Sequence, residues 1–208
     1  RLENLMITLY IETNFFIDFA KNQDQKTEKL VYPQDPEAIA ILNIATPAIC
    51  CMESLSVLES ERNRSNRFGD NLKNEVKKLK GDVNSQYSRE IKQCLEQALI
   101  KNNERINEIN TRLFDVLEWA TNNVELTQLK PDILNTSLEN EFIADPTDNL
   151  ILHCILDHAK TSANEQKVFL SGNHTDFGTP EIKQILREAG IRYFIKTGDF
   201  LGWSRSQP

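Results

Sequence analysis

Short apolar runs with strand character alternate with longer stretches of helical periodicity along this chain of 208 residues. Runs of four to eight apolar, β-favouring residues bounded by polar or glycine-containing segments are typical of buried strands. Strands are predicted over Met6–Ile11, Thr46–Met52, Lys167–Ser171 and Ile191–Ile195. Because parallel strands need a crossover between them, this alternation predicts an α/β fold with a mostly parallel sheet covered by helices on both faces.

The segments between these strands carry helix signals, including proline at a first helical position and a glycine stop at Gly190. Helices are predicted over Phe15–Ala20, Pro36–Ala45, the segment opened by Asp145-Pro146-Thr147-Asp148, Pro180–Ala189 and a terminal turn at Gly198–Trp203. The polar segment Asn22–Asp35 is predicted to be a loop, and Val124–Ile143 shows little periodicity.

The middle of the chain is strongly helical in composition. Leu72, Val76 and Leu79 are spaced by four and three residues, and Gly81–Ser88 interrupts the pattern. We therefore predict two long helices, forming a helical insertion at about residues 62–122 in a single domain that covers residues 1–208. The plain interpretation of such a polar helical pair is a solvated arm.

Composition excludes several classes of protein. Hydrophobic residues make up 39% and charged residues 26% of the chain, which is ordinary globular usage. No apolar run approaches the roughly 20 residues that span a bilayer, and the first residues carry no secretion signal. None of the four cysteines lies in a C-x-x-C pair, so a reduced, cytoplasmic setting is expected, with no membrane partner.

The net charge is −7, yet the charge is unevenly distributed. Residues 61–105 hold 11 Lys/Arg against 7 Asp/Glu, a net charge of +4, which leaves −11 for the rest of the chain. A basic helix face is usually just solvated, but it can also contact the phosphates of a nucleic acid. The candidate nucleic-acid-binding residues in this stretch are Arg62, Arg64, Arg67, Lys73 and Lys77.

Acidic and amide side chains follow the predicted strands. In open parallel sheets, ligands bind beyond the carboxyl ends of the strands, so these side chains are expected to meet at one edge. The candidates are Glu12 and Asn14 after the first strand, Glu53 after the second, Asn173 and Asp176 after the third, and Asp148 at the head of the preceding helix. Converging carboxylates repel unless a cation neutralises them, and a hard divalent ion such as Mg²⁺ or Mn²⁺ prefers oxygen ligands. His153 and His158 are five residues apart, which does not suit a shared zinc site on one helix face.

These motifs together resemble those of the PIN-domain family, metal-dependent nucleases that include many bacterial toxin ribonucleases. The resemblance covers about residues 5–60 and 140–203. Tyr10-Ile11-Glu12-Thr13-Asn14-Phe15 is similar to the family's D-T-N motif, and Glu53 to its second acid. Asp148-Asn149-Leu150-Ile151 is similar to its third acidic motif, and Leu170 to Phe177 (L-S-G-N-H-T-D-F) to its fourth.

The resemblance implies a three-layer α/β/α PIN-like fold and a metal-dependent endoribonuclease. It assigns Glu12, Glu53, Asp148 and Asp176 to catalysis and metal binding, with Asn14, Asn173 and Ser171 supporting them. It favours single-stranded RNA as substrate, and a toxin-type role would add an inhibitor protein or a homodimer as partner. Two positions depart from the family pattern: Glu12 stands where the family has Asp, and Ser171 where it has Thr.

Other interpretations of the same residues remain open. Each acid could be a helix-dipole or turn residue, and Asn14 a helix cap. The extra methylene of Glu12 could weaken the site, leaving a PIN-like module that binds RNA or protein without cutting it. A phosphotransfer enzyme on a doubly wound sheet is a third hypothesis, although the first strand ends in Glu where such an enzyme needs an aspartyl nucleophile.

Overall fold

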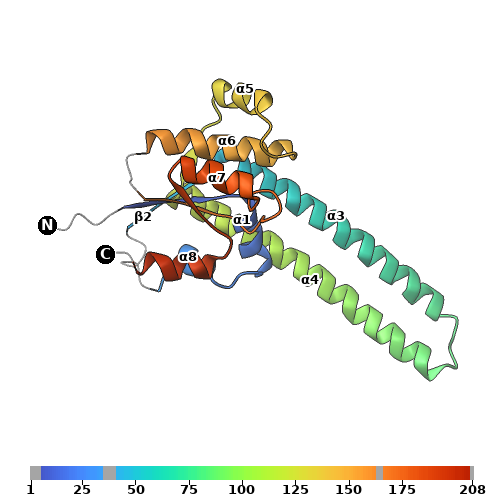
Figure 1. Cartoon of the computed structure of the whole chain (residues 1–208). Helices are drawn as coiled ribbons and strands as arrows, with labels where there is room; N and C mark the ends of the chain where they lie inside the picture. The colour runs from blue at the N-terminus through green and yellow to red at the C-terminus, as the bar shows by residue number, and fades with distance from the viewer. Residues whose placement is uncertain (1–5, 35–40, 163–165, 207–208) are drawn as a thin grey trace. The chain divides into compact units, whose positions relative to one another are not determined.

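A computed structural model describes residues 6–34, 41–162 and 166–206 (Figure 1). The strands are β1 (Ile7–Ile11), β2 (Leu42–Pro47), β3 (Glu125–Thr127), β4 (Gln166–Leu170) and β5 (Ile191–Phe194). The helices are α1 (Thr13–Lys21), α2 (Glu28–Val31), α3 (Ala48–Leu79), α4 (Gln86–Asn123), α5 (Pro131–Glu139), α6 (Pro146–Thr161), α7 (Pro180–Glu188) and α8 (Thr197–Ser204).

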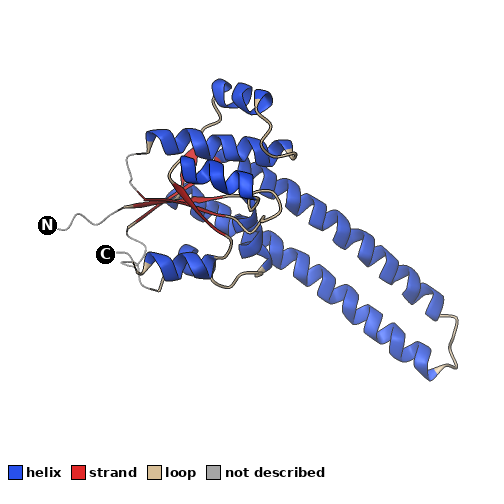
Figure 2. Ribbon diagram, in the orientation of Figure 1, coloured by secondary structure: helices blue, strands red, loops and turns tan. Residues whose placement is uncertain are grey.

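The five strands form one sheet in the order β3-β2-β1-β4-β5, and every neighbouring pair is parallel (Figure 2). Helices α6 and α7 lie on one face of the sheet, and α1 and α8 lie on the other (Figure 1). The predicted three-layer α/β/α fold with a parallel sheet is therefore confirmed. All five residues of the central strand β1 are buried, as expected for a parallel strand covered on both faces.

The second strand lies earlier in the chain than predicted. Residues 42–47 form β2, so the helix predicted over Pro36–Ala45 is wrong for its described part, whereas residues 36–40 lie outside the described residues. The strand predicted over Thr46–Met52 is wrong beyond Pro47, because α3 begins at Ala48. Its apolar run is the buried start of a helix, which a short hydrophobic run cannot distinguish from a strand.

Three further elements come from segments in which no regular structure was predicted. Helix α2 lies within the predicted loop Asn22–Asp35, and β3 and α5 lie within the aperiodic Val124–Ile143. Strand β3 has only three residues and pairs with β2, while α5 begins at Pro131. With four and three residues, α2 and β3 are too short for a period to show.

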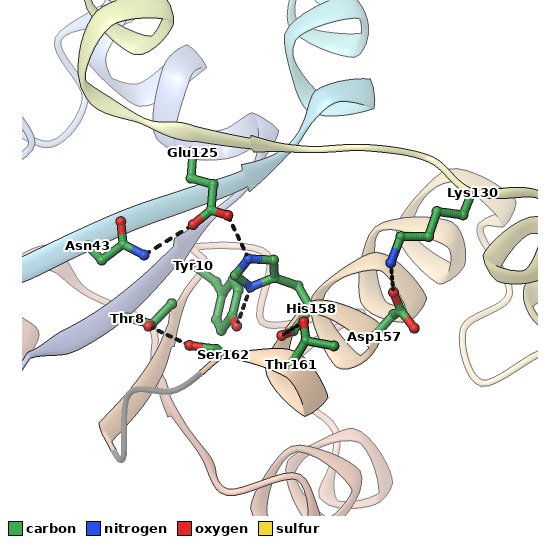
Figure 3. Close-up of polar contacts among 9 residues, drawn as sticks. All are labelled: Thr8, Tyr10, Asn43, Glu125, Lys130, Asp157, His158, Thr161 and Ser162. Carbon is green, nitrogen blue, oxygen red and sulfur yellow. Dashed lines mark hydrogen bonds and ion pairs between the residues drawn. The ribbon is translucent and has the colours of Figure 1, made fainter.

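A polar network joins α6 to the sheet (Figure 3). The Tyr10 hydroxyl lies 2.8 Å from Nδ1 of His158, and Nε2 of His158 lies 3.1 Å from the Glu125 carboxylate. The Asn43 side chain donates to the same carboxylate at 3.1 Å. Three adjacent strands, β1, β2 and β3, are thus tied to the last turns of one helix.

The chain divides into two compact units, Arg1–Ser54 with Leu113–Pro208, and Leu55–Arg112. The second unit contains parts of α3 and α4, with a break between Leu79 and Gln86 that confirms the two predicted long helices. Within it, the Asn102 amide donates to the Ser65 carbonyl at 3.0 Å. No helix in the described part of the chain has the length and apolarity that crossing a bilayer requires.

Candidate active site at the carboxyl edge of the sheet

Glu12 lies between β1 and α1, and it is the residue that caps the helix. One carboxylate oxygen accepts the Asn14 backbone N–H at 2.7 Å, and the other accepts the Ser171 hydroxyl at 2.7 Å. Glu12 is only 2% exposed. Burial therefore raises its pKa to about 8, although both hydrogen bonds favour the charged form. Asn14 was predicted to support the acid, and it contacts Glu12 through its backbone N–H rather than through its side chain.

Ser171 is fixed at the end of β4 by contacts on several sides. Its hydroxyl accepts the Asn173 backbone N–H at 3.1 Å while donating to Glu12. The Tyr193 hydroxyl donates to the Ser171 carbonyl at 3.0 Å, and burial raises the pKa of Tyr193 to about 12, so it remains a donor at neutral pH. Ser171 therefore contacts the site through its hydroxyl and is held in place through its carbonyl.

Glu53 lies in the second turn of α3 and faces the start of α1. The Thr13 hydroxyl donates a hydrogen bond to its carboxylate. Because Thr13 directly follows Glu12 in the chain, this bond brings the second predicted acid next to the first. Consistent with this, the negative charge of Glu53 is among the causes that raise the pKa of Glu12.

Asp148 lies in the first turn of α6, whose cap is Asp145. The Asp145 carboxylate accepts the backbone N–H of Asp148 at 3.1 Å, while the Asn173 amide donates to the Asp148 carboxylate at 2.9 Å. Burial, followed by the negative charges of Asp145, Asp176 and Glu53, raises the pKa of Asp148 to about 7. The high pKa of Asp148 therefore reflects burial first and the neighbouring acids second.

The loop after β4 places Asn173 and Asp176. The Asp176 backbone N–H donates to the Asn173 side chain at 3.3 Å, and the Phe177 N–H donates to the Asn173 carbonyl at 3.0 Å. Phe177 is fully buried with its ring edge-on to Phe169, at 5.0 Å between centroids. A buried aromatic anchor therefore holds the short loop from which Asn173 reaches Asp148.

The structure thus brings all four predicted acids to one edge of the sheet. The charges of other acids in this set contribute to the raised pKa values of Glu12 and Asp148. However, no three carboxylate, histidine or cysteine groups among the described residues lie close enough together to enclose an ion. The set is therefore an open cluster of carboxyl oxygen donors rather than a closed cage.

The predicted basic residues belong to the unit Leu55–Arg112, and several are paired with acids on their own helix. Arg64 lies 3.3 Å from Glu61, and Lys73 lies 3.1 Å from Asp70. Such i,i+3 pairs reduce the positive charge that a phosphate would meet. The further candidates on this helix are Arg62, which pairs with Glu59 at 3.7 Å, Arg67, and Lys77.

Two residues that contact the acids or their supports were missed from the sequence. Thr13 sits inside the E-T-N motif, so its position could have been noticed, although nothing in its residue type indicates Glu53 as partner. Tyr193 lies in the predicted strand I-R-Y-F-I, where its aromatic ring indicates packing. Its hydrogen bond to the Ser171 carbonyl depends on the pairing of β5 with β4, which the sequence does not show.

Comparison with known proteins identifies the family. The family model described as a PIN domain matches residues 9–177, a span that contains Glu12, Glu53, Asp148 and Asp176. The chain therefore belongs to the PIN-domain family, whose fold is of nuclease type. No curated protein and no solved structure matches the chain.

Proposed function

We propose that this protein is a metal-dependent endoribonuclease that hydrolyses RNA phosphodiester bonds at the carboxyl edge of its sheet. The observation that carries the proposal is the convergence of Glu12, Glu53 and Asp148 from three distant parts of the chain, with no lysine or arginine among the described residues that bond to them. Membership of a family with a nuclease-type fold supports the same chemistry.

The donor set fits a hard divalent cation, Mg²⁺ or Mn²⁺. All four acids offer oxygen, and Mg²⁺ keeps several waters while binding one or two carboxylates, so a tight cage of three protein groups is not required. Glu12 and Asp148 would hold the ion, with Glu53 and Asp176 adding charge and ligands. Such an ion supplies Lewis acidity and charge stabilisation for phosphodiester hydrolysis.

The remaining groups of the site keep these carboxylates in position. Ser171 and the Asn14 backbone orient Glu12, Thr13 orients Glu53, and Asn173 orients Asp148. Hydrogen bonds that hold ligands in place contribute substantially to metal affinity and activity. Single-stranded RNA is the substrate that the family resemblance favours, and the toxin-type role with its inhibitor or homodimer stays a prediction.

A second candidate function is favoured by one observation. Both oxygens of Glu12 already accept hydrogen bonds from the chain, and the acids do not enclose an ion as they stand in the described residues. A site fixed in this state would bind RNA or protein without cutting. Titration calorimetry with Mn²⁺ distinguishes the two functions, because a non-cutting module of this kind would show no heat of binding at millimolar metal.

Cleavage of labelled single-stranded RNA in Mn²⁺ tests the proposed activity directly. The Asp148→Asn variant should lose cleavage, whereas Asp132→Asn should retain it. The control is matched, because Asp132 is also a first-turn helix acid and lies on the exposed surface of α5. Equal cleavage by the two variants and the wild type would remove this site from the mechanism.

A further inference from the structure

A second site lies beside the edge strand of the sheet. A cavity of about 660 Å³ is lined by Lys183 and Arg187 from α7, by Arg192 and Tyr193 from β5, and by Pro180, Gly190 and Ile191. Three of these seven residues are cationic, and none is acidic. The chain has a net charge of −7, yet the charged residues that line this cavity are all positive. The cavity is therefore a locally positive region on a negatively charged protein.

Helix α7 carries two cations and two acids, and Glu181, in its first turn, lines neither of the two cavities beside the helix. Lys183 and Arg187 are four residues apart, so they project from the same face at a separation of about 6 Å along the helix axis. The nearby acid Glu188 lines a different cavity together with Ile185 and residues of α5 and α6, and it accepts a bond from Gln184 at 3.0 Å. The two cations of α7 therefore line their cavity while this acid lines another.

Tyr193 connects this cavity to the acidic site. The Lys183 ammonium lies 5.8 Å from the centre of the Tyr193 ring, and the hydroxyl of the same tyrosine donates to the Ser171 carbonyl. The Ser171 hydroxyl in turn donates to Glu12. One aromatic side chain thus lines the cationic cavity at its ring and reaches the backbone of the acidic site at its hydroxyl.

The topology gives the cavity a direction. Helix α7 returns the chain from the carboxyl end of β4 to the amino end of β5, so Lys183 lies nearer the acidic edge than Arg187 does. Arg192 of β5 also lines the cavity, but its guanidinium lies 5.0 Å from the centre of the Trp203 ring of α8, on the other face of the sheet. The positive charge of the cavity therefore comes from Lys183 and Arg187, and it extends away from the acids along α7.

We propose that this cavity, here called the edge groove and defined by Lys183, Arg187 and Tyr193, binds phosphates of a single-stranded RNA next to the acidic site. The inference rests on the proposed function for its choice of ligand, since an RNA held at the acids must continue past them. Carboxylates that attract a metal repel the flanking phosphates, so a separate cationic track adjoining the acids supplies the attraction that they lack. The edge groove is an alternative to the predicted basic residues on α3, of which Arg64 and Lys73 lie beside i,i+3 acids.

RNA binding can be measured without cleavage, by fluorescence anisotropy of a labelled single-stranded RNA dodecamer in EDTA at several salt concentrations. The test variant is Lys183→Gln/Arg187→Gln in the full chain. The control is Lys73→Gln/Lys77→Gln on α3, which removes the same charge at the same i,i+4 spacing. Circular dichroism checks that both variants are folded, and Lys183→Arg/Arg187→Lys tests whether charge alone restores binding.

We expect the groove variant to bind RNA about tenfold more weakly than the wild type near 0.1 M salt. The negative slope of log affinity against log salt concentration should become shallower by about 1.4, as expected for the loss of two phosphate contacts. The α3 control and the charge-conserving variant should stay near the wild type. Unchanged affinity and slope in the groove variant, an equal loss in the α3 control, or no RNA binding by the wild type would overturn the inference.

The outcomes separate this inference from the proposed function. A wild type that binds RNA through the groove but does not cleave it in Mn²⁺ would retain the edge groove and reject the nuclease. If the wild type cleaves RNA and the groove variant binds it with unchanged affinity and salt dependence, the nuclease is retained and the edge groove is rejected.

Discussion

The Ser171 hydroxyl donates a hydrogen bond to Glu12 at 2.7 Å, joining the ends of the neighbouring strands β4 and β1. The bond is buried, with Ser171 and Glu12 both 2% exposed. It fixes one of the two oxygens of the Glu12 carboxylate. The side chain is held at both oxygens, by Ser171 on one side and by the backbone of its own helix on the other.

Removing this hydroxyl should destabilise the protein. In Ser171→Ala, one oxygen of a buried carboxylate loses its donor, at a cost of about 1.5–3 kcal/mol in the free energy of unfolding. Ser171→Thr keeps the hydroxyl and should stay close to the wild type. Urea unfolding at pH 9 measures both, since Glu12 is then charged. Equal stability of the alanine and threonine variants would show that the bond contributes nothing.

Glu12 should make the metal-free protein less stable as pH rises. Its pKa is raised from 4.5 in the unfolded chain to about 8 in the folded state, so the folded state holds the proton more tightly. The resulting stability is fully present below pH 4.5 and is lost as pH rises to 8, by an amount on the order of a few kcal/mol.

Glu12→Gln should therefore remove much of this pH dependence. Urea unfolding in EDTA at pH 5 and pH 8.5 should show the variant gaining stability over the wild type only at the higher pH. Glu139→Gln, which removes an exposed acid on α5, serves as the control. If the stability difference between Glu12→Gln and the wild type is the same at pH 5 and pH 8.5, as it should be for Glu139→Gln, the pKa of Glu12 is not raised in the metal-free protein.

The sequence predicted the sheet and the order of the acids because both depend on local signals. Strand β1 is a continuous apolar run, and the acids directly follow strands or open helices, where parallel topology sends them to one edge. The predicted boundaries of β2 were wrong because its pairing with β1 and β3 outweighs local propensity. Thr13 and Tyr193 contact the site through partners 40 and 22 residues away, and no local pattern encodes such pairs.

Gly178 closes the loop that carries Asn173 and Asp176. Its N–H donates to the His174 carbonyl at 3.1 Å, and a Cβ at Gly178 would collide with the backbone of His174. Gly178→Ala should open the loop, separate Asn173 from Asp148, and lower both the unfolding free energy, by more than about 1 kcal/mol, and the RNA cleavage rate.

Gly202→Ala is the matched control for this change. A Cβ at Gly202 meets no atom within 4 Å, and the residue lies inside α8, where alanine is the better helix former. This variant should unfold at the same or a higher temperature than the wild type. Thermal unfolding of the pair decides the question, and a Gly178→Ala variant as stable as Gly202→Ala would mean that the loop backbone can shift without loss.

The bond between Tyr10 and His158 should hold α6 against the sheet (Figure 3). In the tautomer that carries its proton on Nε2, His158 donates to the Glu125 carboxylate and its Nδ1 accepts from the Tyr10 hydroxyl. Burial raises the pKa of Tyr10 well above its ordinary value, so the phenol stays protonated. Tyr10→Phe would leave Nδ1 without this donor and should lower the free energy of unfolding by about 1–2 kcal/mol.

Tyr32→Phe provides the comparison, because Tyr32 is 58% exposed and its hydroxyl can be replaced by water. Urea unfolding at pH 8 should place this control near the wild type and Tyr10→Phe below it. The ¹⁵N shifts of the His158 ring give a second readout, since the tautomer with a proton on Nε2 is favoured by the Tyr10 donor. Loss of Tyr10 should shift the ring toward the other tautomer or toward exchange between the two. Unchanged ring shifts together with unchanged stability would mean that the phenol and the imidazole are neighbours without a bond between them.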